Sequence, residues 1–138
     1  MPVLNRIVQA TIRATRAIRR LAPEATVILC DSCEHHHTRE PQLEPDVRLR
    51  NLRRFAVLDL LTGRVDQTHP LYKWFISYGF SDPDLEWIKT NRWAPDVIGL
   101  DYYTHTETQL ESTSNGLRQR KPGTARPYTY GPYHAGLC

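Results

Sequence analysis

The stretch PDVIGLDYYTHTE, residues 95–107, decides how this sequence is interpreted. Its apolar part, Val97 to Leu100, is typical of a strand that is buried on both faces, as in a parallel sheet. An aspartate, two tyrosines, a threonine and a histidine then follow in succession. We therefore predict a strand over 97–103 that ends in several side chains able to form hydrogen bonds.

A second apolar run, ATVILC at residues 25–30, predicts another strand buried on both faces. A helix precedes it, because apolar residues recur at helical spacing before Pro23, with four of the arginines largely outside that face. These apolar positions are Leu4, Ile7, Val8, Ile12, Ile18 and Leu21. The first 23 residues hold five arginines and no acid, which is also typical of a targeting peptide or a membrane-surface helix. The direct passage into a strand favours a helix packed on a sheet.

The middle of the chain predicts a loop followed by several helices. Residues 31–45 are polar, contain two prolines and predict a long loop, whereas 47–61 predict one helix that Gly63 ends. A short aromatic helix should end at Gly79. Ser81 and Asp84 then have the spacing of a capping box at the start of another helix. The order of helices and strands indicates an α/β protein.

Composition narrows the class of protein. The 138 residues suggest one domain, and a net charge of +3 gives no reason to expect nucleic acid as a partner. No run of about 18 apolar residues is present, so we expect no membrane span. Cys30, Cys33 and Cys138 make an odd number of cysteines without a disulfide framework. These features predict a reduced, cytoplasmic protein.

Two segments carry a resemblance to a known family. APDVIGLDYYTHTE (94–107) resembles the sixth barrel strand of the glycoside hydrolase family 1 β-glucosidase group, whose usual form is D-[FV]-[IL]-G-[IL]-N-Y-Y-[TP]. FAVLDLLTGRVDQTHPLY (55–72) is similar to that group's helix and loop written W-F-L-D-P-L-x-x-G-x-Y-P. The resemblance implies that residues 1–112 are part of a TIM (β/α)8 barrel, from about helix 4 to strand 6. Residues 113–138 are predicted to be an irregular, disordered tail.

The resemblance also implies a parent activity and a set of site residues. Members hydrolyse β-glycosidic bonds with two carboxyl groups and without a metal or organic cofactor, and barrel active sites lie at the carboxyl ends of strands. A small glycoside would then contact Asp101, Tyr103 and His105 after one strand, and Glu34, His35 and His36 after the other. Asp101 stands where the family normally has Asn. A carboxylate added there would shift the pKa values of its neighbours.

Neither catalytic motif of the family, Asn-Glu-Pro or Thr-Glu-Asn-Gly, occurs in this sequence. A full barrel also needs roughly 250 residues. We therefore expect a fragment of a glycosidase-like barrel that has no catalytic residues and no hydrolase activity of its own.

Two alternatives stay open at this point. The chain could be a stand-alone, non-catalytic module that binds a carbohydrate or a protein and self-associates through open sheet edges. It could also be a small zinc protein, because Cys30 and Cys33 precede three histidines at 35–37. A closed zinc site usually needs a second, distant pair of ligands, so we predict no metal site here.

Overall fold

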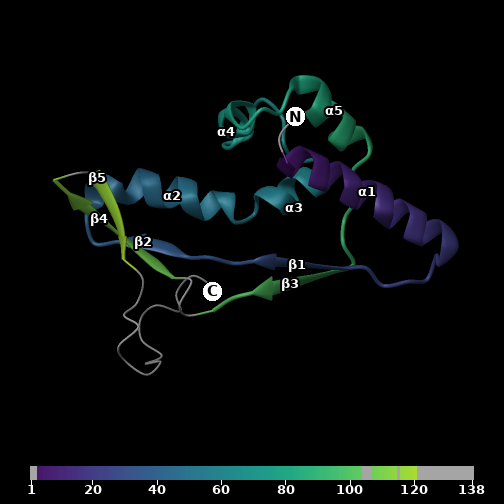
Figure 1. Ribbon diagram of the computed structural model, residues 1–138, viewed down its shortest axis with the longest axis horizontal. Coiled ribbons are helices and arrows are strands. Elements are labelled where there is room, and N and C mark those ends of the chain that lie inside the picture. The colour runs from purple at the N-terminus through teal and green to yellow at the C-terminus, as the bar shows by residue number, and fades with distance from the viewer. Residues whose placement is uncertain (1–2, 104–106, 115, 121–138) are drawn as a thin grey trace. The chain divides into compact units, whose positions relative to one another are not determined.

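The computed structural model describes residues 3–103, 107–114 and 116–120. Within these residues the protein is mixed α/β, with five α-helices, one 3-10 helix and two small open sheets (Figure 1). The chain divides into two compact units. Unit 1 comprises Met1–Leu29 and Phe55–Gly99, and unit 2 comprises Cys30–Arg54 and Leu100–Cys138. The chain therefore enters each unit twice.

The elements in chain order are α1 (Val3–Leu21), β1 (Ile28–Ser32), β2 (His36–Thr38), the 3-10 helix η1 (Pro41–Leu43), α2 (Glu44–Arg53), α3 (Ala56–Leu61), α4 (Tyr72–Ser77), α5 (Asp82–Thr90), β3 (Val97–Asp101), β4 (Thr108–Thr113) and β5 (Gly116–Arg120).

Unit 1 is built around helices α1, α3, α4 and α5. Phe75 of α4 is fully buried and packs edge-to-face on Phe80, with 5.3 Å between the ring centroids. The other buried apolar side chains come from α1, α3, α5 and the connections between the helices: Val8, Ile12, Ala56, Leu60, Leu61, Val65, Leu71, Leu85 and Ile88. Burial of this much apolar surface is the main term that stabilises unit 1.

The helix ends of unit 1 follow the local signals in the sequence. Gly63 has φ of 69°, its N–H donates to Leu60 O, and the next N–H, of Arg64, donates to Asp59 O. This is a Schellman motif, and Gly79 with φ of 83° forms the same motif at the end of α4. The predicted capping box of α5 is confirmed, with Ser81 and Asp84 each bonding to the other's backbone N–H.

The predicted face of α1 is only partly right. Val8 and Ile12 are buried, but so are the polar Asn5 and Thr15, whereas Ile7, Ile18 and Leu21 are exposed. The sequence prediction merged two apolar faces of the helix into one. The buried face is the one that contacts α3 and α5.

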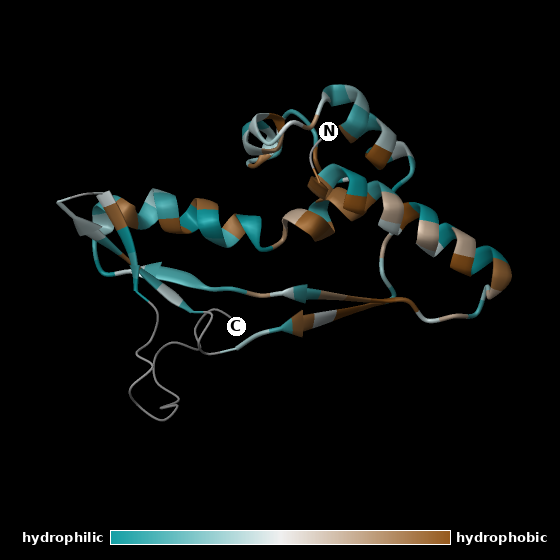
Figure 2. Ribbon diagram, viewed as in Figure 1, coloured by the Kyte–Doolittle hydropathy of each residue, from teal (hydrophilic) through white to brown (hydrophobic). Residues whose placement is uncertain are grey.

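The two predicted strands exist and pair with each other. Figure 1 shows β1 and β3 side by side and pointing the same way, and the bonds Asp96 N to Val27 O and Cys33 N to Asp101 O agree with a parallel pair. The prediction that they are buried was wrong. Ile28, Val97, Ile98 and Leu100 are 46–57 % exposed, and Figure 2 shows the hydrophobic residues of β3 in brown. An apolar run is buried only where neighbouring elements cover it, and this two-stranded sheet has no further strand in the described residues.

Unit 2 holds the second sheet, in the order β2-β4-β5. β2 pairs in parallel with β4, with His36 opposite Thr108, and β4 forms an antiparallel hairpin with β5. Its apolar core is the cluster of Leu43, Val47 and Leu110.

Three predicted boundaries differ from the structure. The predicted loop at 31–45 contains β2 and η1, and the predicted helix at 47–61 is divided into α2 and α3. The division falls where the chain passes from unit 2 to unit 1, so the two halves pack in different units. Residues 116–120, in the predicted irregular tail, form β5 by pairing with β4, while 121–138 lie outside the described residues.

Candidate functional site

Two backbone hydrogen bonds bring together the segments that carry the predicted site residues. Cys33 N–H donates to Asp101 O over 3.1 Å, at the end of β3. Thr108 N–H donates to His35 O over 2.8 Å, at the start of β4. The loop at 33–35 therefore lies beside the end of β3, and all of these residues belong to unit 2.

Asp101 and Tyr103 form a pair at the end of β3. Both side chains are exposed, and the Tyr103 hydroxyl donates a hydrogen bond to the Asp101 carboxylate. That bond, together with the negative charge of Asp101, raises the pKa of Tyr103. A carboxylate next to a phenol offers one acceptor and one donor to solvent or to a ligand. His105 lies outside the described residues.

The residues predicted on the other segment separate onto two faces. Glu34 is exposed, and His35 is half-buried, with its ring stacked on His37 at 6.2 Å between centroids. Burial lowers the pKa of His35, and the nearby Arg54 guanidinium lowers it further; Arg54 Nη1 lies 3.5 Å from His35 Nδ1.

His36 belongs to the opposite face of β2 and is buried. Burial lowers its pKa, as do the positive charges of Arg50 and Arg53 on α2. The Asn51 side chain brackets the His36 backbone, accepting from its N–H and donating to its carbonyl, each over 2.8 Å. The Cys33–Asp101 bond thus places the segment with Glu34 and His35 beside the end of β3, whereas His36 faces α2.

A buried carboxyl group that the sequence did not indicate lies next to these residues. Glu107 is 0 % exposed, and its Oε1 accepts a hydrogen bond from the Tyr102 hydroxyl. Its Oε2 is buried and has no hydrogen-bond partner among the described residues. The charge of Glu107 also acts on His35. Burial, then the Glu107 bond and charge, then the charge of Cys33, raise the pKa of Tyr102 to about 12.

The Glu107 side chain is the group in unit 2 best suited to bind a hydrogen-bond donor. A buried carboxyl oxygen without a partner costs free energy, on the order of 1–3 kcal/mol or more. Such groups in native proteins call for an explanation, and a ligand that supplies a donor is one. A hydroxyl or an ammonium group would satisfy Oε2.

The described residues do not form a metal site by themselves. No group of three or more His, Cys, Asp or Glu side chains lies close enough among them to hold an ion. Cys30 is exposed on β1, whereas Cys33 is buried, and neither is in a disulfide.

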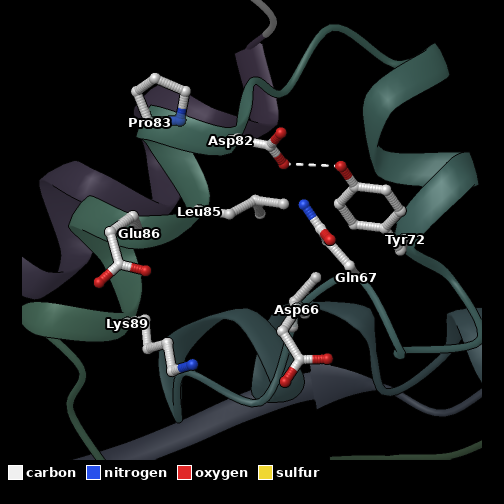
Figure 3. Close-up of a pocket in the computed structure, with 9 residues that line it drawn as sticks. Asp66, Gln67, Tyr72, Asp82, Pro83, Leu85, Glu86 and Lys89 are labelled. Atoms are coloured by element: carbon white, nitrogen blue, oxygen red, sulfur yellow. Dashed lines mark hydrogen bonds between the residues drawn. The ribbon is translucent and has the colours of Figure 1, made fainter.

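Unit 1 contains a separate open pocket of about 420 Å³. Figure 3 shows the Tyr72 hydroxyl donating to Asp82 over 2.6 Å, with Asp66, Glu86 and Lys89 also on its wall. The bond to Asp82 raises the pKa of Tyr72. The Asp66, Asp82 and Glu86 carboxylates are exposed to solvent. None of these three carboxylates is buried without a hydrogen-bond partner, as Glu107 Oε2 is in unit 2.

No protein-family model, no curated protein and no solved structure matches the chain. Among its described helices, none combines the length and the apolar character that crossing a membrane requires.

Proposed function

We propose that this chain is a section of a glycoside hydrolase family 1-like (β/α)8 barrel and that unit 2 binds a small, hydroxyl-rich glycoside at the ends of β1 and β3. The observation that carries the proposal is the Cys33–Asp101 hydrogen bond at the end of the β1–β3 pair. It joins two segments, one after each strand, that the sequence resemblance assigns to the sugar-binding face.

The connection between the two strands supports the barrel part of the proposal. β1 and β3 are parallel, and helices α2 to α5 lie between them in the chain, which is the connection that a β-α-β unit requires. Their exposed apolar side chains also fit strands that pack between further strands and covering helices.

Each proposed contact has a defined chemistry. Asp101 offers carboxylate oxygens and Tyr103 a phenol at the surface, and Glu107 Oε2 offers an acceptor that has no donor. Sugar hydroxyl groups both donate and accept hydrogen bonds, so they suit this combination. Retaining hydrolysis needs two carboxyl groups about 5–5.5 Å apart, and both family motifs that supply them are missing from the sequence. We therefore propose binding without turnover.

An NMR titration of the 15N-labelled full chain with methyl β-D-glucopyranoside tests this function. We expect amide shifts at Asp101, Tyr103 and Glu107, and at least a several-fold weaker response in Asp101→Asn and Glu107→Gln. Asp82→Asn, in the unit 1 pocket, is the matched control and should bind as the wild type does. p-Nitrophenyl β-D-glucopyranoside should not be hydrolysed.

Two results would overturn the proposal. One is the absence of amide shifts in unit 2 at tens of millimolar glycoside. The other is turnover of the aryl glucoside that Glu34→Gln or Glu107→Gln abolishes, because the chain would then carry a catalytic carboxyl group of its own.

A second candidate function, self-association, is favoured by the exposed β1–β3 pair. An uncovered, apolar strand pair with open edges readily adds strands from another chain. Sedimentation velocity between 5 and 200 μM, roughly the range in which weak association is measurable, should show a concentration-dependent increase in mass that Ile98→Lys reverses. A wild-type protein that stays monomeric throughout would exclude this candidate.

A further inference from the structure

Helix α1 has an apolar stripe on the side that faces away from the core of unit 1. The stripe consists of six exposed residues at alternating spacings of four and three: Val3, Ile7, Ala10, Ala14, Ala17 and Leu21. Val3 and Leu21, at its ends, are 73 % and 89 % exposed. The opposite side of the helix already packs in unit 1 through Val8 and Ile12. Alternating four-three spacing is the pattern by which one helix packs along another.

The charged residues of α1 itself are all positive. α1 contains five arginines and no acidic residue. Arg6, Arg13 and Arg20 recur every seven residues, so they form a column along one border of the stripe. Arg6 and Arg20 are exposed and form no ion pair within the described residues, while the Arg13 guanidinium lies 4.8 Å from the centre of the Trp87 ring.

We propose that the stripe of α1 docks an acidic amphipathic helix of a partner protein. That helix would carry apolar residues at heptad spacing, with Glu or Asp residues in the positions that meet the arginine column. Charge complementarity identifies the partner, because charged residues that flank a helical seam decide which helices pair and in which direction.

A second copy of the chain fits this surface less well. In an antiparallel pair of α1 helices, the two columns of Arg6, Arg13 and Arg20 would face each other and repel. In a parallel pair, the arginine column of each helix would face the opposite border of the partner helix's stripe. That border consists of Leu4, Thr11 and Ile18, which carry no negative charge. An acidic partner helix would provide the negative charges that both arrangements lack.

A lipid surface also fits less well than a helix. Membrane-surface helices bury bulky apolar side chains in the acyl region, and their binding increases with the apolar area inserted. The centre of the stripe consists of three alanines, which contribute little area but let a second helix approach closely.

The test uses the full chain and a fluorescein-labelled synthetic peptide of three heptads, with Leu at the two seam positions and Glu at the flanking positions. Fluorescence anisotropy should show saturable binding at physiological salt that weakens as salt increases. Ile7→Asp, and separately the double variant Arg6→Glu with Arg20→Glu, should weaken binding by about tenfold or more. Because these side chains are exposed, circular dichroism should show an unchanged fold.

Ile76→Asp is the matched control, because Ile76 is an exposed isoleucine on α4 and should leave binding unchanged. Glu107→Gln should also leave it unchanged, so this surface is tested independently of glycoside binding. No binding of the peptide, or equal binding of a peptide with Lys in place of Glu, would overturn the proposal. So would phosphatidylserine vesicles binding the chain while the peptide does not, or a wild-type dimer that Ile7→Asp dissociates.

Discussion

Units 1 and 2 differ in what they bury. Unit 1 buries apolar side chains almost throughout, with Leu60, Leu71 and Phe75 at 0 % exposure. Unit 2 has an apolar core of three side chains and buries His36, Thr108 and Glu107 as well. Apolar burial stabilises a fold, whereas burial of polar groups costs free energy unless they are hydrogen-bonded. We therefore expect unit 1 to hold most of the stability and unit 2 to hold the groups that a ligand can use.

The largest effect should come from the core of unit 1. Phe75→Ala removes a fully buried ring that packs against Phe80 and should lower the free energy of unfolding by about 3–5 kcal/mol. Urea denaturation followed by tryptophan fluorescence measures this, because all three tryptophans, Trp74, Trp87 and Trp93, belong to unit 1. Ile76→Ala, at the neighbouring exposed position, is the control. If Phe75→Ala lowers the free energy of unfolding by less than about 1 kcal/mol, unit 1 does not hold most of the stability.

Leu110→Ala should break the smaller core of unit 2. Leu110 is fully buried with Leu43 and Val47, so the loss should be about 2–3 kcal/mol. Amide hydrogen exchange should then show faster exchange at β2 and β4, with unchanged protection at α5. Equal loss of protection in α5 would mean that the two units unfold as one.

Ser81→Ala removes one half of the capping box of α5 and should cost about 1 kcal/mol. The effect should appear in the thermal midpoint of unit 1, monitored by tryptophan fluorescence. Ser77→Ala is a suitable control, because the Ser77 hydroxyl bonds to a carbonyl at the end of α4 and caps no N–H group. If both variants lose the same stability, the cap contributes nothing specific.

The smallest effect should be a difference in pH dependence. Burial lowers the pKa of His36 and of His35 in the folded state below the usual 6.5, so unit 2 binds fewer protons folded than unfolded. Their contribution to stability is therefore complete above pH 6.5 and is lost as the pH falls through the lower folded pKa values. In unit 1, the Val27 N–H and Arg19 lower the pKa of Asp96, so its contribution is lost only below the usual 3.8.

NMR signals of Leu110 and Phe75, followed in urea at pH 7.5 and 5.5, measure this difference. We expect the urea concentration at the unfolding midpoint to decrease for the Leu110 signal at pH 5.5, and to change less for the Phe75 signal. His36→Asn should reduce the pH dependence of unit 2. A decrease for Phe75 as large as for Leu110 would contradict the assignment to the histidines.

The sequence predicts this fold where the structure depends on nearby residues. Ser81 with Asp84, Gly63 and Gly79 act within one turn of the chain, and all three helix ends were predicted correctly. β2 was missed because its strand pairing joins His36–Thr38 to residues some 70 positions later. The predicted burial of β1 and β3 was wrong because an apolar run indicates a preference for burial, but does not show that other elements pack over it.

The candidate site divides in the same way. Asp101 and Tyr103 could be predicted because they follow an apolar strand, and the structure pairs them. Glu107 could not, because it lies in the polar run THTET and its burial arises from contacts that the run does not reveal. A sequence also cannot tell that His35 and His36 lie on opposite faces until the strand at 36–38 is known.

The alternation of the chain between units has a consequence for synthesis. The last segment of unit 1 ends at Gly99, so all of unit 1 can emerge from the ribosome and fold before the segment Leu100–Cys138 of unit 2 has been synthesised. Thr38 bonds to Leu110, 72 residues later, and at 5–20 residues per second that partner emerges about 4–14 s after it. Only during the last part of that interval, after Gly99 has emerged, can the segment Cys30–Arg54 be held at both ends by a folded unit 1, as a tethered loop that still lacks the rest of its sheet.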